Sequence, residues 1–350
     1  MFNTIKYEDL KGNYILVDVR SPKEYDEYTI PGAINIPLFS DEERALVGTI
    51  YKQESTEKAK KVGIEIVSKR LPKIYNDFLE LEKKYGKIVL FCARGGMRSG
   101  SLASLLHSLG MRVERIKGGY KGYREYIREV LPKINEDITY VVLHGNTGVG
   151  KTEILKKLKI DGYDTLDLEG FANHRGSILG AVGLGEVNSQ KKFESLIFSE
   201  LKSRKTNYIF IEAESKRIGR VIIPEYIHNK MKDGIHIFVD ADINFRANLI
   251  INEYTKSVKS NEEICNSLIR INKILSKETL EDYCTRVMNN DYEEVVKELM
   301  IKYYDPMYMH SANTYKYEKN IIVETIEDAS KELEQFIDSY LKNEEINNIF

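Results

Sequence analysis

Two glycine-rich loops in this sequence carry different reactive groups. The first runs from Cys92 to Ser99 (CARGGMRS) and follows the apolar residues 88–91. The second runs from Gly145 to Thr152 (GNTGVGKT) and follows the largely apolar residues 140–143. Each pattern predicts a strand, a turn and the start of a helix, a geometry in which backbone N–H groups converge on an anion. The first loop therefore offers a thiol beside an anion site, and the second offers a cradle for a diphosphate.

Cys92 is predicted to be a nucleophile assisted by Arg94 and Arg98. The N-terminus of the following helix and the two guanidinium groups both lower the pKa of a thiol. Because the thiolate is the reactive form, the loop favours covalent chemistry on an anionic or soft donor, which Gly95 and Gly96 would help to bind. A buried structural cysteine is the alternative, but it would not need two arginines and two glycines beside it.

The second loop matches the full Walker A pattern, G-x4-G-K-[ST]. Its N–H groups are expected to cradle a diphosphate, Lys151 to add a positive charge, and the Thr152 hydroxyl to hold Mg²⁺. The pattern indicates a diphosphate more firmly than it indicates ATP or GTP. The residues expected to contact the diphosphate are Gly145, Asn146, Thr147, Gly148, Val149, Gly150, Lys151 and Thr152.

Two polar stretches follow later strands of the same predicted sheet, where ligands bind in open α/β folds. One covers residues 167–177 (DLEGFANHRGS), and the other covers residues 212–219 (EAESKRIG). Their acidic side chains could partner the Walker A loop, although helix caps or solvated carboxylates fit equally well; they are Asp167, Glu169, Glu212 and Glu214. The candidates for substrate contacts are Asn173, His174, Arg175, Glu212, Ser215 and Arg217.

Strands that alternate with helices predict a parallel α/β sheet in each half of the chain. We expect a first domain at residues 1–133 and a second at residues 138–350, with a linker at residues 132–137. Strands of the second domain are expected at 138–144, 163–168, 208–212 and 235–239. From Phe245 onward the pattern is helical and charged.

Composition narrows the class of protein. No apolar stretch approaches the ~18 residues that span a bilayer, so no membrane partner is expected. The three cysteines lack CxxC spacing, which argues against a disulfide framework or a structural zinc site and indicates the cytoplasm. The net charge of −2 gives no overall basic field. Basic clusters at residues 202–205 and 216–220 leave RNA binding open, because a local patch is enough to neutralise phosphates.

The first loop resembles the active-site loop of rhodanese domains, in which a cysteine accepts sulfur or selenium. The resemblance extends through residues 17–20 (VDVR), 30–37 (IPGAINIP) and 117–120 (KGGY). One difference is the spacing, Cys-x5-Arg here against the usual Cys-x4-Arg. Cysteine phosphatases share Cys-x5-Arg, so a phosphatase remains an alternative. A rhodanese sulfurtransferase coupled to an ATP-binding domain is another.

The two loops, the two polar stretches and the pattern Gln190-x2-Phe193-Glu194 together resemble bacterial tRNA 2-selenouridine synthases. The resemblance covers residues 10–310. It implies an α/β fold: an N-terminal rhodanese-like parallel sheet with flanking helices, then a P-loop NTPase-like α/β domain with a helical C-terminal region.

The same resemblance implies a transferase with two co-substrates. Geranyl diphosphate would first alkylate the sulfur of wobble 2-thiouridine in tRNAs for Lys, Glu and Gln, and selenium from selenophosphate would then displace the geranylthiol. Cys92, with Arg94 and Arg98, would receive or steer selenium, while the P-loop would hold the diphosphate. The implied partners are the tRNA and an enzyme that supplies selenophosphate, with Mg²⁺ as a candidate metal ion.

Overall fold

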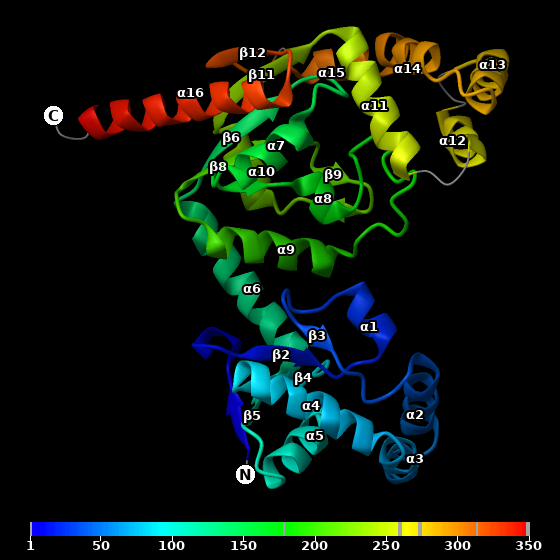
Figure 1. Cartoon of the computed structure of the whole chain (residues 1–350), viewed down its shortest axis with the longest axis vertical. Coiled ribbons are helices and arrows are strands. Elements are labelled where there is room, and N and C mark those ends of the chain that lie inside the picture. Colours follow the sequence, from blue (N-terminus) through cyan, green and yellow to red (C-terminus); the bar gives the residue numbers. More distant parts are fainter. Residues whose placement is uncertain (1, 178, 258–260, 272–274, 313, 348–350) are drawn as a thin grey trace. The chain divides into compact units, whose positions relative to one another are not determined.

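The computed structural model describes residues 2–177, 179–257, 261–271, 275–312 and 314–347. The chain divides into two compact units (Figure 1): an N-terminal unit of residues 1–133 with 194–199, and a C-terminal unit of residues 134–193 with 200–350. Each unit is built around one five-stranded parallel sheet, so the expected α/β class is confirmed.

The sheet of the N-terminal unit has the strand order β1-β5-β4-β2-β3. Its strands are β1 (Asn3–Ile5), β2 (Ile15–Asp18), β3 (Ile34–Asn35), β4 (Ile88–Phe91) and β5 (Val113–Ile116). Every residue of β2 and β4 is buried, which explains why their sequences are nearly continuous apolar runs. All neighbours are parallel, so the residues that follow β2 and β4 lie at the same edge of the sheet.

The helices of this unit flank the sheet, and two of them begin with side-chain capping boxes. They are α1 (Pro22–Glu27), α2 (Asp41–Gln53), α3 (Thr56–Ser68), α4 (Leu71–Tyr85), α5 (Met97–Ser108) and α6 (Gly119–Glu136), after a 3-10 turn at Tyr7–Asp9. α5 begins at Met97, directly after Gly96, and the cysteine loop therefore lies at its N-terminus.

The linker predicted at residues 132–137 contains the boundary between the two units, at 133/134, and most of it is helical, because α6 continues through Pro132 to Glu136. A proline removes one intrahelical hydrogen bond. The buried stripe of Tyr123, Ile127 and Leu131 on the same helix keeps it packed on one side.

The sheet of the C-terminal unit has the strand order β12-β11-β6-β8-β7, again all parallel. Its strands are β6 (Thr139–His144), β7 (Thr165–Leu166), β8 (Tyr208–Glu212), β11 (Ile235–Ala241) and β12 (Lys319–Val323), and a separate antiparallel pair comprises β9 (Arg217–Ile218) and β10 (Val221–Ile222). The four strands predicted from the sequence are confirmed, although β7 is shorter than expected. β12 contradicts the prediction that everything after Phe245 is helical.

The helices of this unit divide into sheet-covering helices and a separate helical region. They are α7 (Lys151–Ile160), α8 (Leu168–Ala172), α9 (Gln190–Ser203), α10 (Glu225–Lys232), α11 (Ile243–Ser257), α12 (Asn261–Leu268), α13 (Lys277–Met288), α14 (Glu293–Leu299), α15 (Asp305–Ala312) and α16 (Ile326–Asn347), with a 3-10 turn at Ile269–Ile271 and a π-helical turn at Met300–Tyr304. One face of the sheet packs on α7 and α16 through side chains such as Leu143, Val239 and Leu333.

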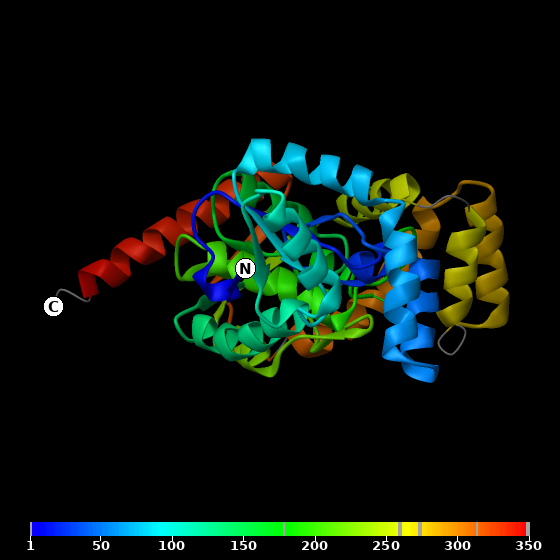
Figure 2. The same ribbon diagram turned by 90° about the horizontal axis from the view of Figure 1, so that it is seen from below.

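The helical region has its own core. α12 and α13 lie side by side at one end of the unit in both views (Figures 1 and 2). Their buried residues Leu268 and Tyr283 join Val295 of α14 in a hydrophobic cluster. Within the described residues, we find no helix that is long and apolar enough to cross a bilayer.

Candidate functional site

Cys92 follows β4 and lies at the N-terminus of α5, buried but beside the loop that leads into this helix. Burial opposes ionisation of the thiol. Even so, its pKa is below the ordinary value, because the Ser99 hydroxyl, backbone N–H groups of Ser99 and Arg94, and the charge of Arg98 all stabilise the thiolate. Ser99 Oγ lies 3.1 Å from Cys92 Sγ. These contacts fit the predicted nucleophile, and a catalytic role for Cys92 stays a prediction.

The two arginines of this loop differ in what they contact. Arg98 makes two hydrogen bonds to the carboxylate of Glu24, of 2.6 and 3.3 Å, so its contribution to the thiolate acts through charge. Arg94 is exposed, and its backbone N–H contributes to the lowered pKa of the thiol. The sequence identified both residues but could not reveal that Glu24 holds Arg98.

Two glycines account for the close packing beneath the cysteine loop. Gly119 has φ +59°, and a Cβ there would lie 2.2 Å from the carbonyl oxygen of Cys92. Gly95 has φ +62°, and a Cβ there would lie 3.0 Å from the backbone nitrogen of Gly119. The backbone N–H of Tyr120 also donates to the Cys92 carbonyl. The start of α6 therefore packs against the cysteine loop, and only glycine fits where the backbones of Gly119 and Cys92 meet.

The P-loop connects β6 to α7 in the predicted strand–loop–helix arrangement. Gly145, Gly148 and Gly150 all have positive φ, and a Cβ on Gly145 would lie 2.2 Å from the carbonyl oxygen of Val239. Lys151 Nζ donates to the carbonyl oxygen of Gly145 at 2.7 Å. The loop thus has the left-handed backbone that an anion nest requires, and its lysine lies over it.

Glu169 and Glu212 lie beside the P-loop threonine. Thr152 Oγ1 is 3.1 Å from Glu212 Oε2 and 3.3 Å from Glu169 Oε2, and the backbone N–H of Glu169 donates to Glu212 Oε1 at 2.9 Å. Asp167 instead caps α8 by accepting from the Gly170 N–H. Of the candidate carboxylates, the structure therefore brings Glu169 and Glu212 to Thr152 and assigns Asp167 to a helix cap.

A third carboxyl, that of Glu214, belongs to the same group. Burial raises the pKa of Glu169, Glu212 and Glu214, and each carboxylate raises the pKa of another, to about 8 for Glu214. Gly176 passes close by, since a Cβ there would lie 2.8 Å from Glu214 Oε2 and 2.9 Å from Glu169 Oε1. Carboxylates crowded in this way favour a bound cation.

A magnesium ion at this point would need ligands from outside the protein. Among the residues that the structure describes, no group of three or more His, Cys, Asp and Glu side chains could hold a metal ion by itself. Mg²⁺ commonly takes one or two carboxylates, with waters and phosphate oxygens completing its octahedron. The Thr152 hydroxyl with Glu169 and Glu212 fits that pattern, so Mg²⁺ at Thr152 stays a prediction.

Arg246 is a residue of the P-loop surroundings that the sequence did not reveal. It lies on α11, donates from Nε to the Thr147 carbonyl at 3.0 Å, and pairs with Asp305 through hydrogen bonds of 3.0 and 2.5 Å. Its side chain is almost fully buried. In the sequence Arg246 is one charged residue in a long charged helical stretch, so no local signal distinguishes it.

The stretch 173–175 is held mainly by contacts within the protein. Asn173 has φ +51° and donates to the carbonyls of Leu184 and Glu186. Arg175 pairs with Glu253 and lies 4.6 Å from the ring centroid of Tyr254.

His174 packs tightly between two glycines, with ring atoms 2.8 Å from where a Cβ on Gly180 would lie and 2.7 Å from one on Gly219. Burial, and then the charge of Arg175, lower its pKa. A substrate role for residues 173–175 therefore stays a prediction, while their structural role is visible.

Ser215 and Arg217 lie at the exit of β8 and on β9. Ser215 Oγ donates to the Arg217 carbonyl at 2.7 Å, and Arg217 Nε donates to the Gly219 carbonyl at 3.1 Å. Both residues are exposed. Substrate contacts by either one stay predictions.

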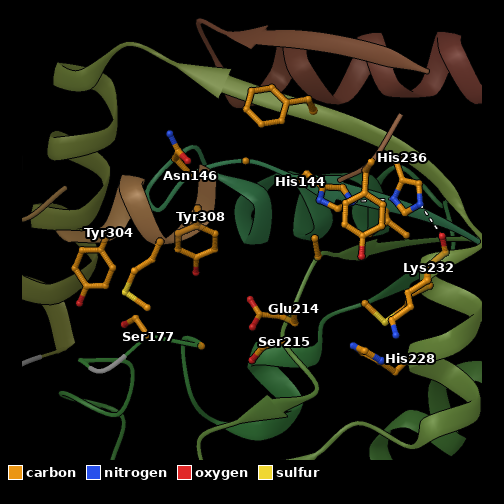
Figure 3. A pocket seen from close by; sticks show the side chains of 18 of the residues that line it. His144, Asn146, Ser177, Glu214, Ser215, His228, Lys232, His236, Tyr304 and Tyr308 are labelled. Carbon is orange, nitrogen blue, oxygen red and sulfur yellow. Dashed lines mark hydrogen bonds between the residues drawn. The ribbon is translucent and has the colours of Figure 1, made fainter. Parts of the chain in front are cut away.

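A cavity of about 430 Å³ opens beside the P-loop (Figure 3). Gly145 and Asn146 line it at one end, and Glu214 and Ser215 line it at the exit of β8. The N-terminal unit thus carries one candidate site, the thiol loop, and the C-terminal unit carries another, the P-loop with its carboxylate group and adjacent cavity.

These features define a class: a rhodanese-like domain joined to a P-loop domain. A family model described as the rhodanese-like domain matches residues 6–126, and a model described as the tRNA 2-selenouridine synthase AAA domain matches residues 138–343. The second model covers more than half of the chain. The chain belongs to the tRNA 2-selenouridine synthase family.

Similarity to curated relatives extends over most of the chain. A tRNA 2-selenouridine synthase of Sulfurovum sp. is 30% identical over 94% of this chain and 95% of its own length. Those of Hydrogenovibrio crunogenus and Nitrosomonas eutropha are 32% and 33% identical, over 85% and 76% of this chain and 88% and 71% of their own lengths.

Proposed function

We propose that this chain is a transferase that replaces the sulfur of wobble 2-thiouridine in tRNA with selenium, acting on tRNAs for Lys, Glu and Gln in the cytoplasm. The family to which it belongs and the names of its relatives support an enzyme that acts on tRNA. The observation that carries the proposal is the presence of two anion-binding loops, one with an activated thiol and one with a Walker A lysine, in a single chain of this family.

In the first proposed step, the thiocarbonyl sulfur attacks C1 of geranyl diphosphate. The S–C1 bond forms, the C1–O bond breaks, and the base loses its N3 proton. The P-loop N–H groups and Lys151 stabilise the charge that grows on the diphosphate, which is electrostatic catalysis by donors that are already in place. Thr152, with Glu169 and Glu212, would hold Mg²⁺, which would neutralise part of that charge.

An apolar cavity of about 80 Å³ reaches the P-loop at Thr147 and supports a prenyl group next to the diphosphate. Its walls include Leu179, Ile250 and Leu299. A mostly apolar lining suits a hydrocarbon chain better than a ribose, whose hydroxyl groups would need hydrogen-bond partners. Because the cavity is small, we place only the end of the chain that adjoins the diphosphate there.

In the second proposed step, the selenium of selenophosphate attacks C2 of the geranylated base, the C2–S bond breaks, and geranylthiol leaves with the donor's proton. Water then cleaves the Se–P bond, which gives 2-selenouridine and releases phosphate. Cys92 would direct the donor, and the backbone N–H groups around Gly95 and Gly96 would bind its phosphate part. Arg94, which is exposed beside the loop, adds positive charge for an anionic donor. An enzyme that makes selenophosphate would be the upstream partner.

Two other functions remain as alternatives. A rhodanese sulfurtransferase coupled to an ATP-binding domain would consume a thiosulfate-like donor and turn over nucleotide without tRNA. A cysteine phosphatase, suggested by the Cys-x5-Arg spacing, would hydrolyse phosphoesters and would tolerate loss of Lys151.

The test is mass spectrometry of tRNA nucleosides after incubation of the protein with 2-thiouridine tRNA, geranyl diphosphate and selenophosphate. We expect a geranylated nucleoside with geranyl diphosphate alone, and 2-selenouridine once selenophosphate is added. Cys92→Ala should abolish selenation but keep geranylation, and Lys151→Ala should abolish geranylation. Unchanged nucleosides with consumption of thiosulfate or a phosphoester would refute the proposal in favour of an alternative.

A further inference from the structure

The larger cavity beside the P-loop has aromatic walls on two sides. The sheet contributes Val142 and His144 of β6 and His236 and Phe238 of β11, all on the face opposite to that covered by α7. Tyr315, from the segment before β12, packs directly on this wall, with its ring centroid 4.7 Å from that of His144 and 4.4 Å from that of His236. The facing wall comes from the chain around α15, and its aromatic residues are Tyr303, Tyr304 and Tyr308. Flat rings on both sides suit a planar ligand.

Polar groups are placed at both ends of this cavity (Figure 3). Asn146 and Ser177 line the end near the P-loop, and Glu214 and Ser215 lie between the two ends. Lys232 and His228 line the other end. The pKa of His228 is lowered mainly by burial and secondly by the positive charge of Lys232, which indicates that the two side chains are close. A cavity with apolar walls and a few polar groups is the usual form of a small-molecule site. The lysine adds a contact for a phosphate at the rim.

His144 is fixed as a hydrogen-bond acceptor. Nε2 of His236 must donate to the Lys232 carbonyl at 3.0 Å, because a carbonyl cannot donate. In the neutral pair, Nδ1 of His236 then accepts from Nε2 of His144 at 2.8 Å. The remaining nitrogen of His144, Nδ1, therefore carries a lone pair. This fixed tautomer can accept a hydrogen bond from a ligand that presents an N–H.

We propose that this cavity receives the target nucleobase after it leaves the RNA stack, and that His144 Nδ1 accepts from its N3–H. The inference rests on the proposed function, a reaction on a tRNA uridine. Enzymes that modify a base hold it outside the stack, between aromatic side chains, and recognise its Watson–Crick edge. Uracil and 2-thiouracil both present N3–H on that edge. Lys232, which also lines the cavity, is a charged group that would pair with a backbone phosphate of the extruded nucleotide.

The linings of the two cavities beside the P-loop support a base in the larger cavity and a hydrocarbon in the smaller one. Ser177 and Tyr304 line both of them, so a base in the larger cavity and a prenyl end in the smaller one would meet next to the loop. The smaller cavity has a mostly apolar lining, whereas the larger one has more hydrogen-bonding groups, which a hydrocarbon would leave unpaired. The sulfur and C1 would come together at this junction.

Photo-crosslinking tests the position of the base without requiring the reaction. An anticodon stem-loop RNA with 4-thiouridine at the wobble position is bound to the full chain and irradiated with near-ultraviolet light, and crosslinked tryptic peptides are identified by mass spectrometry. We expect the peptide of residues 303–316, which carries Tyr304, Tyr308 and Tyr315. A crosslink confined to peptides that do not line the cavity would overturn the proposal.

Filling the cavity provides a matched pair of variants. Met231 lines the cavity and is buried, whereas Met288 on α13 is 51% exposed and lies outside it. Met231→Trp should reduce crosslinking to residues 303–316 at least about tenfold, and Met288→Trp should leave it unchanged. If Met231→Trp keeps the crosslink but weakens binding of geranyl diphosphate, the cavity holds the prenyl chain and the base assignment is wrong.

A chemical change in the base tests His144 separately, even if Met231→Trp fails to fold. N3-methyl-2-thiouridine in the stem-loop removes the N–H, so the wild-type chain should bind it about tenfold more weakly than 2-thiouridine. His144→Phe keeps a ring in place and should bind both RNAs equally. If His144→Phe still discriminates tenfold, His144 does not recognise N3–H. If the wild-type chain crosslinks as expected but never modifies tRNA, the proposed reaction fails and the base pocket stands.

Discussion

At the scale of single residues, the cysteine loop shows how hydrogen bonds can outweigh burial. Burial alone would raise the pKa of Cys92, yet its pKa lies below the ordinary value. The largest of the stabilising contacts is the Ser99 hydroxyl, 3.1 Å from the sulfur. Arg98 is partly neutralised by Glu24 and contributes less. Reactivity of the thiol therefore depends on the first turn of α5 more than on the neighbouring arginines.

Ser99→Ala should raise the pKa of Cys92, because it removes a donor to the thiolate. The rate of alkylation of Cys92 by iodoacetamide, followed by mass spectrometry of its peptide, should then reach half of its maximum about 0.5–1 pH unit higher than in the wild type. Ser104→Ala, at an exposed position of the same helix, is the control and should leave the profile in place. An unshifted profile in Ser99→Ala would assign the low pKa to other groups.

The carboxyl of Glu214 gives a pH-dependent contribution to stability. In the folded chain it keeps its proton up to about pH 8, whereas in the unfolded chain it loses it near the ordinary value of 4.5. Between these values the folded state binds more protons, so the free energy of unfolding falls as pH rises.

Glu214→Gln removes the titrating carboxyl, so the free energy of unfolding should fall less steeply with pH in this variant. Melting temperatures measured from pH 5 to pH 8 with a chelator present should fall by at least about 3 °C less in the variant than in the wild type. Parallel curves for the two proteins would contradict the raised pKa.

At the scale of elements, the contact between the cysteine loop and the start of α6 depends on Gly119. Alanine there must adopt φ +59° and also place its Cβ 2.2 Å from the Cys92 carbonyl oxygen. Gly110→Ala is a matched control, because Gly110 has φ +89° with no atom within 4 Å of its Cβ position. The control should cost about 1–2 kcal/mol for the left-handed backbone alone.

Gly119→Ala should cost at least about 2 kcal/mol more than the control, since the backbone must also shift to relieve the overlap. Denaturant unfolding of both variants measures the difference, and the alkylation rate of Cys92 reports whether its loop has moved. Equal stabilities would mean that the loop accommodates a methyl group without strain.

Elements also show where prediction from sequence stops. Strands β4, β6, β8 and β11 were predictable because each is a buried apolar run before a turn. β12 was not, because its five residues lie between charged helical stretches, and only pairing with β11 makes them a strand. That pairing joins Ile237 to Lys319, a separation over which no local pattern extends.

At the scale of the whole molecule, two units with separate sheets should respond separately to ligands. The P-loop belongs to the C-terminal unit and the thiol loop to the N-terminal unit. Diphosphate at a hundred times its Kd should stabilise the unit that binds it by about 2.7 kcal/mol. For a unit of this size, that raises the melting temperature by about 5–10 °C.

Differential scanning calorimetry with and without diphosphate measures this effect. We expect two transitions, of which one moves upward, and no movement in Lys151→Ala. If both transitions move together, the two units do not unfold independently. If neither moves, the P-loop does not bind diphosphate.

The sequence by itself determined the two loops, because a strand, a glycine turn and a helix start are local patterns whose backbone geometry follows from neighbouring residues. The tertiary structure decided which carboxylates meet Thr152. Glu169 and Glu212 follow different strands, and the order β6-β8-β7 brings them together, while Asp167 turns to cap its own helix. It also decided that Arg246, on a distant helix, holds the P-loop backbone. Such contacts depend on the packing of segments far apart in the chain, and local sequence does not encode that packing in any pattern that can be recognised.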